Sequence, residues 1–155
     1  MKILKEYFMA AIISFEFLIL LVGCALFFVQ HKVQIVSSQL SDTPEILKHI
    51  ALLPSAMAVW TFNENKKLLF PDEDEGAILQ KWPDYWKLKI YFKVSLAYAL
   101  LFAAIGLGVW LLGYKVTDPK GFTPLVVSVI GAFIVVMATY FAKIQQREIL
   151  LSNKK

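Results

Sequence analysis

Two long apolar runs separated by a short polar turn constrain the fold of this chain more than any other feature. The runs cover residues 94–113 and 122–142, and neither contains a charged side chain. Each run has about the 20 apolar residues that cross a hydrocarbon layer roughly 30 Å thick. The segment between them contains the turn formers Asp118, Pro119 and Gly121. The sequence therefore predicts a transmembrane hairpin, with one helix in residues 91–114 and the other in residues 122–142.

A third apolar run, residues 7–29, is also long enough to cross the membrane, although Glu16 interrupts it. Hydrophobic residues make up 58% of the chain and the mean hydropathy is +0.60, which is too apolar for an ordinary soluble domain. We therefore expect an all-α integral membrane protein with three transmembrane helices. The first helix falls in residues 1–30, a helical cytoplasmic insert in residues 31–90 separates it from the second, and residues 143–155 form a helical tail.

Cys24 leaves an alternative for the first apolar run. Residues 1–5 are basic, and residues 21–24 resemble the cleavage box of a bacterial lipoprotein signal peptide. The run stays apolar through Val29, whereas the apolar part of a signal peptide is about 7 to 15 residues long and a polar segment follows it. We expect an uncleaved anchor with a buried thiol, and lipidation of Cys24 is the alternative. Because the chain has one cysteine, neither an internal disulfide nor a thiol-rich metal site can form.

The insert contains an amphipathic segment that begins near Pro44, a residue accepted at the first position of a helix. Apolar residues recur there at helical spacing and share one face: Ile46, Ile50, Leu53, Met57 and Trp60. Pro54 predicts a kink or a two-part helix near Leu53. The apolar stretch 50–62 is too short to span, so we expect residues 46–62 to lie in the interface, re-enter shallowly or pack against the membrane helices. A spanning segment is the alternative, and it would change the orientation of everything before it.

Acidic and aromatic residues precede the second transmembrane helix. The acidic residues are Asp72, Glu73, Asp74 and Glu75, and acids at a helix start complement the helix macrodipole. A calcium loop fits poorly, because Gly76 comes one place early and Pro83 replaces the bidentate glutamate, so we expect no metal and no cofactor. The next group has the aromatic and basic character of residues at headgroup depth: Trp82, Trp86, Lys89 and Lys93.

Basic residues are distributed unevenly around the three expected spans. The insert and the tail carry most of them, whereas the amino terminus and the hairpin turn carry Lys2, Lys5, Lys115 and Lys120. Because basic residues near span ends stay in the cytoplasm, we expect the insert and the tail inside, and the amino terminus outside, an inner (plasma) membrane. The net charge of +4 comes from lysines interleaved with acids, so no nucleic-acid partner is expected.

Glu16 is the one charged residue in the three apolar runs, and an acid at mid-membrane costs on the order of 3 kcal/mol. It should face a bundle interior, a partner or a water path. A proton or ion relay needs a second titratable group in the membrane, and the other runs offer hydroxyls instead, so we expect a neutral, hydrogen-bonded carboxyl.

Small residues at steps of about four predict close helix packing, either within the chain or between the subunits of an expected homo-oligomer. They are Ser95, Ala99, Ala103, Ala104, Gly108, Ser128 and Ala132.

No catalytic motif occurs in the sequence, and His31 and His49 are its only histidines, so we expect that the protein is not an enzyme. The expected function is that of an oligomeric membrane anchor or sensor subunit for a cytosolic effector protein. This partner would bind the Ile46 to Trp60 face and the acidic edge at residues 72–75. Small membrane components of bacterial anti-phage defence systems have this organisation, by architectural analogy alone. The alternatives are an immunity protein against a pore-forming toxin and a small oligomeric channel around Glu16.

Overall fold

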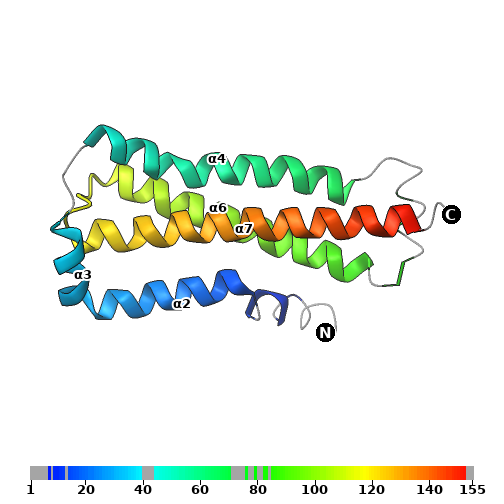
Figure 1. The fold of residues 1–155 in the computed structure, drawn as a ribbon, viewed down its shortest axis with the longest axis horizontal. Coiled ribbons are helices and arrows are strands. Elements are labelled where there is room, and N and C mark those ends of the chain that lie inside the picture. Colours follow the sequence, from blue (N-terminus) through cyan, green and yellow to red (C-terminus); the bar gives the residue numbers. More distant parts are fainter. Residues whose placement is uncertain are drawn as a thin grey trace.

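The structure is a computed structural model and describes residues 7, 9–12, 14–39, 44–70, 76, 79, 82–83 and 85–152. Its elements are the helices α2 (Phe15–Phe28), α3 (Gln30–Ser37), α4 (Pro44–Leu69), α6 (Tyr85–Leu111) and α7 (Pro119–Ser152). Helices α2, α4, α6 and α7 run side by side and alternate in direction, and α3 is a short connection at one end (Figure 1). The start of α2 and the end of α7 lie toward the opposite end. The expected all-α fold is confirmed for the described residues.

Two helices are long and apolar enough to cross a membrane. They are α6 (Tyr85–Leu111), with 27 residues, and the segment Pro119–Glu148 of α7, with 30 residues. These helices contain the two runs from which the hairpin was predicted. The helix Phe15–Leu26 is apolar but shorter. Among the described residues, two candidate spans thus stand where three were expected.

Two capping motifs build the turn between α6 and α7. Gly113 has a φ of 66°, in the left-handed region, and its amide and the next one donate to carbonyls in the last turn of α6 at 3.2 Å. Glycine suits this position because a Cβ is disfavoured at such a φ. At the start of α7, the Asp118 carboxylate accepts from the Lys120 amide at 3.0 Å, and Pro119 takes the first helical position. The chain therefore returns beside α6, as the sequence predicts.

The first apolar run does not form one helix. Residues 9–12 are helical, and α2 begins only after a break at Ser14. The Ser14 hydroxyl donates to the Ala11 carbonyl at 2.8 Å and accepts from the Phe17 amide at 3.2 Å. A side chain that satisfies backbone groups on both sides ends one helical segment and caps the next. Glu16 therefore lies in the first turn of a helix.

Helix α4 is continuous over 26 residues and contains Pro54. Of the two outcomes expected near Leu53, a kink or a two-part helix, the two-part helix does not occur. Helix α4 packs along both α6 and α7 (Figure 1). A Cβ on Gly106 of α6 would lie 2.8 Å from the Ala51 carbonyl oxygen and 3.2 Å from Cγ of Pro54. The two helices thus approach to backbone distance, which a residue without a side chain allows. Residues 44–69 belong to the same bundle as the apolar helices. Of the three places expected for residues 46–62, the structure shows packing against these helices.

The side of α4 that faces the bundle is small or polar. Its buried residues recur at steps of three and four and include Ala51, Pro54, Ala58, Thr61 and Asn65. The bulky residues lie on the other side of the helix, where Ile50, Leu53 and Trp60 are exposed. Small side chains let helices approach closely, so the larger apolar residues mark the outer face of α4.

The bundle is apolar on the outside and mixed on the inside. Each of the four long helices exposes large hydrophobic side chains, for example Leu18, Val59, Leu100 and Phe133. The main buried cluster combines small residues with a few large ones: Ala58, Ala99, Phe102, Ala103, Val127, Ala132 and Val135. Hydroxyl groups lie between the helices as well, since Ser128 and Thr139 are buried. A soluble helical bundle has the opposite distribution.

Candidate functional site

The small residues predicted to pack helices fall into two groups. One group is buried inside the bundle: Ser95, Ala99, Ala103, Ser128 and Ala132. The other opens outward, because Ala104 is exposed and a Cβ on Gly108 would meet no atom within 4 Å. The first group packs helices within one chain, and the second makes no such contact with the described residues.

The predicted partner-binding residues of α4 lie on the outer surface. Ile50, Leu53 and Trp60 are exposed, while Met57 is half-buried against the core. The side chain of Ile46 and the acidic residues Asp72, Glu73, Asp74 and Glu75 lie outside the described residues. Helix α2, which carries Glu16, lies on the other side of the α6 and α7 pair (Figure 1). The structure therefore does not bring the α4 face and Glu16 together.

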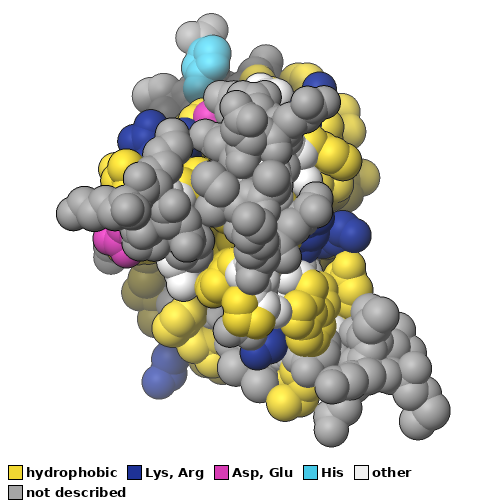
Figure 2. Space-filling view, turned by 90° about the vertical axis from the view of Figure 1, so that its right-hand side faces the viewer, with side chains coloured by type: hydrophobic (Ala, Val, Ile, Leu, Met, Phe, Trp, Pro, Cys, Tyr) yellow, Lys and Arg dark blue, Asp and Glu magenta, His cyan; other side chains and the backbone are white. Residues whose placement is uncertain are grey.

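The predicted membrane-interface residues lie together, just before α6 and on its first turns: Trp82, Trp86, Lys89 and Lys93. The Lys87 ammonium lies 6.0 Å from the ring centre of Trp86, and the Lys89 ammonium lies 4.4 Å from that of Tyr85. Both distances fall within cation–π range. Figure 2 looks onto this end of the bundle and shows Lys and Arg side chains around it, with hydrophobic side chains on the flanks.

A buried polar layer at the same end was not predicted. The Asn65 amide of α4 donates to the Phe92 carbonyl oxygen of α6 at 3.3 Å. The Lys143 ammonium of α7 forms an ion pair with Glu64 of α4. Together these contacts join three helices through polar groups. The sequence signal that could have found them is the helical spacing of Thr61 and Asn65 with the small residues of α4.

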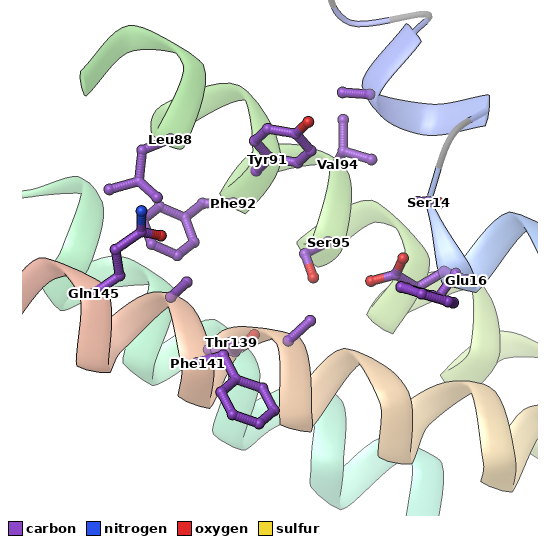
Figure 3. A pocket seen from close by; sticks show the side chains of 14 residues that line it. Ser14, Glu16, Leu88, Tyr91, Phe92, Val94, Ser95, Thr139, Phe141 and Gln145 are labelled. Atoms are coloured by element: carbon purple, nitrogen blue, oxygen red, sulfur yellow. The ribbon is translucent and has the colours of Figure 1, made fainter. Parts of the chain in front are cut away.

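Glu16, the predicted intramembrane acid, lies at a pocket between α2, α6 and α7 (Figure 3). The pocket has a volume of about 410 Å³. Glu16 is 6% exposed, and its carboxyl points toward the Ser95 hydroxyl of α6 (Figure 3). Thr139 of α7 also lines the pocket. Polar side chains from three helices therefore surround one cavity.

Aromatic residues are also among those that line the pocket. They are Phe15, Tyr91, Phe92 and Phe141. These residues come from three helices that are far apart in the sequence, so spacing along one helix could not have grouped them. Glu16 and the small residue Ser95 were singled out from the sequence, but not as members of one site.

Several polar groups at the pocket lack a hydrogen-bond partner. Within the described part of the chain, Ser95 Oγ and Thr139 Oγ1 are buried without a partner, and the Glu16 carboxyl makes no hydrogen bond or ion pair. The expected hydrogen bond of Glu16 is therefore absent from the described residues. The Tyr98 hydroxyl donates to the Ala11 carbonyl at 3.0 Å and holds the segment before α2 against α6. Buried polar groups normally have hydrogen-bond partners. The Glu16 carboxyl and the hydroxyls of Ser95 and Thr139 can therefore receive a ligand or water.

The chemistry of this arrangement is that of a binding site. It presents one carboxyl, two hydroxyls and several aromatic rings. A carboxylate and hydroxyl oxygens accept hydrogen bonds, so the groups suit a proton, a hydrogen-bond donor or a cation. Among the described residues, no group of three or more His, Cys, Asp or Glu side chains could hold a metal ion.

Cys24 lies in the middle of α2 and is exposed, whereas a buried thiol was expected. It borders a smaller apolar pocket of about 240 Å³ between α2, α6 and α7. The residue faces outward because Gly23 takes the inward position, where a Cβ would lie 2.7 Å from the Val127 side chain.

No family model matches the sequence, and neither a curated protein nor a solved structure matches the chain. The contacts of its own residues are therefore the basis for assigning a function.

Proposed function

We propose that this protein is a non-enzymatic integral membrane subunit whose four long helices, α2, α4, α6 and α7, all lie in the bilayer. The observation that carries this proposal is the exposure of large hydrophobic side chains on the outer side of each of them. Soluble proteins rarely expose contiguous apolar surface of this kind. Lipid tails solvate it, while the polar side chains inside the bundle are kept away from lipid.

Helix α4 is the least apolar of the four, and its contacts explain how it fits. Its apolar stretch 50–62 rises about 20 Å at 1.5 Å per residue. The polar residues that follow have partners on neighbouring helices, since Glu64 pairs with Lys143 and Asn65 donates to Phe92. A short span of this type is accommodated by local thinning of the bilayer and by side chains that reach the interface.

A four-span arrangement places both chain ends on one side of the membrane. The described basic residues at that end are Lys66, Lys67, Lys87, Lys89, Lys93, Lys143 and Arg147. Those at the other end are Lys32, Lys48, Lys115 and Lys120. The positive-inside rule then favours a cytoplasmic location for both termini and for the α4–α6 connection. The amino terminus is inside in this proposal, whereas the three-span expectation placed it outside.

The end of the bundle that this proposal places in the cytoplasm has a packed apolar cluster and a protruding helix. These features favour a role as an anchor or sensor subunit. Leu79, Tyr85, Leu88 and Phe92 form a buried cluster there, and Trp82 and Leu150 pack against it. Helix α7 continues from Lys143 to Ser152, which is about 15 Å beyond its apolar run. The surface at this end is where a soluble protein partner would bind. The outward pair Ala104 and Gly108 supports association with further copies of the chain.

Cysteine labelling tests the four-span topology. Single cysteines replace Lys32, Lys115 or Glu148 in a Cys24→Ser background, and intact cells are treated with a membrane-impermeant maleimide. We expect Lys32→Cys and Lys115→Cys to react from outside and Glu148→Cys to react only after permeabilisation. Protection of Lys32→Cys together with Glu148→Cys would restore the three-span topology and reject this proposal.

Native mass spectrometry tests the anchor role. The wild-type protein, purified in mild detergent from its native host, should carry a soluble protein at fixed stoichiometry. Arg147→Glu reverses an exposed charge on the tail of α7 and should release this partner, whereas Lys120→Glu, at the other end, should not. A lone monomer in every preparation would contradict the anchor role and favour an immunity protein whose toxin is missing. A channel formed around Glu16 is less favoured, because Glu16 faces a pocket within its own chain.

A further inference from the structure

We propose that the pocket at Glu16 binds an organic ammonium with an apolar chain, whose cationic group pairs with the Glu16 carboxylate and whose chain lies along the apolar wall. The proposal rests on the pocket alone and does not depend on the anchor function. A lipid headgroup and a free amphiphilic amine both carry this chemistry.

The charge of the site favours a cation. Glu16 is 6% exposed and has no ion-pair partner among the described residues. A buried carboxylate without a partner is unfavourable, so the site favours a ligand that brings a positive group. Two lysines from the same helices are engaged elsewhere, since Lys89 lies over Tyr85 and Lys143 pairs with Glu64. A ligand can therefore supply the missing positive charge.

The rest of the pocket favours an ammonium group over an anion or a neutral alcohol. Its lining residues include Phe15, Tyr91, Phe92 and Phe141, and an ammonium group that contacts the face of an aromatic ring is attracted to it. The unpartnered hydroxyls of Ser95 and Thr139, which are 9% and 1% exposed, offer lone pairs to N–H donors. The Glu16 carboxylate would repel an anion. An alcohol carries no charge and would leave the negative charge of Glu16 unbalanced.

The shape and position of the pocket fit a molecule with two unlike ends. Its volume of about 410 Å³ lies within the range of roughly 300 to 1,000 Å³ that small-molecule sites occupy. Its wall includes the aliphatic side chains of Leu88 and Val94, and also Gln145 and Tyr91 toward the end with the aromatic and basic belt. A ligand of the bilayer interface, where amphiphiles concentrate, can therefore place its chain on apolar side chains.

Titration calorimetry of the full-length protein in a nonionic detergent compares three probes that have the same number of carbon atoms and different polar groups. They are hexylamine, hexanol and hexanoate. We expect saturable binding of hexylamine, about tenfold or more tighter than hexanol, and no binding of hexanoate. Glu16→Gln should weaken hexylamine binding about tenfold and leave hexanol unchanged. The matched control is Glu148→Gln, which removes an exposed acid of α7 and should bind hexylamine like the wild type.

A second variant covers the case in which Glu16→Gln does not fold. Tyr91→Leu keeps an apolar side chain but removes one ring, and it should weaken hexylamine binding by about threefold without affecting hexanol. Equal affinities of wild-type protein for hexylamine and hexanol would overturn the proposal. Equal losses in Glu16→Gln and Glu148→Gln would do the same.

Native mass spectrometry identifies the source of the ammonium. The protein is extracted from vesicles that contain phosphatidylethanolamine or, as the matched lipid without an amine, phosphatidylglycerol. Retention of phosphatidylethanolamine by the wild type and its loss in Glu16→Gln would identify a lipid headgroup. Binding of hexylamine without retained phosphatidylethanolamine would identify a free amine. Absence of both interactions would refute the site.

Discussion

The Asn65 amide on α4 donates to the main-chain oxygen of Phe92 on α6 at 3.3 Å, and both residues are buried. A carbonyl oxygen has two lone pairs, so Phe92 can accept this bond while it remains part of its own helix. The contact fixes the depth and rotation of α4 against α6 at the point where α4 becomes polar. It links α4 to a helix that the sequence identified as a span.

Asn65→Ala should lower the free energy of unfolding by about 1 to 3 kcal/mol, because it removes a buried hydrogen bond and leaves a small cavity. The measurement is unfolding of the purified protein in detergent. Asn63→Ala is the matched control, since Asn63 is exposed on the same helix, and it should change stability by less than about 0.5 kcal/mol. Equal effects of the two variants would mean that α4 does not pack on α6 through Asn65.

Gly106→Val should destabilise the bundle by about 1 to 3 kcal/mol, because its side chain meets the main chain of α4 and cannot be accommodated by a rotamer change. A Cβ at this position would lie 2.8 Å from the Ala51 carbonyl oxygen. The matched control is Gly108→Ala, two residues along the same helix, where a Cβ has open space. Thermal unfolding in detergent should show a loss for the first variant and none for the second. Tolerance of Gly106→Val would place α4 away from α6.

The sequence predicts the parts of the fold that depend on one helix at a time. The apolar runs that form α6 and α7 and the turn between them were found because length and missing charge are local properties. The position of α4 was left open among the interface, a shallow re-entry and packing against the membrane helices, because apolar periodicity singles out bulky residues. In this bundle bulky residues such as Leu53 face outward, while Pro54 and Thr61 face inward.

The candidate site was predicted only in part, for a related reason. Glu16 was recognised because a lone acid in an apolar run is conspicuous without any knowledge of its neighbours. Its surroundings depend on which residues of α6 and α7 lie opposite α2. That register is set by close contacts such as Gly23 against Val127, and spacing within one helix does not encode it.

The ion pair between Glu64 and Lys143 should couple α4 to α7. Glu64 is mostly buried and Lys143 is partly exposed. Removal of Lys143 therefore leaves the mostly buried Glu64 carboxylate without the ammonium group that balances its charge. We expect Lys143→Met to destabilise the protein more than Glu64→Gln combined with Lys143→Met. A double-mutant cycle on unfolding free energies should give a coupling of about 1 kcal/mol. A coupling near zero would mean that solvent screens the pair fully.

Leucines at Ala104 and Gly108 should reduce self-association without unfolding the protomer. Ala104 is exposed and a Cβ on Gly108 has open space, so larger side chains are accommodated within one chain. Between two copies the same side chains would hold the helices apart, because small residues allow the close approach on which helix association in membranes depends. Native mass spectrometry should show a shift toward monomer, with an unfolding midpoint close to that of the wild type. The control is Ala25→Leu, which enlarges an exposed small residue on α2 and should leave the mass distribution unchanged. If the double variant stays as oligomeric as the wild type, the outward face of α6 is covered by lipid and copies of the chain meet elsewhere.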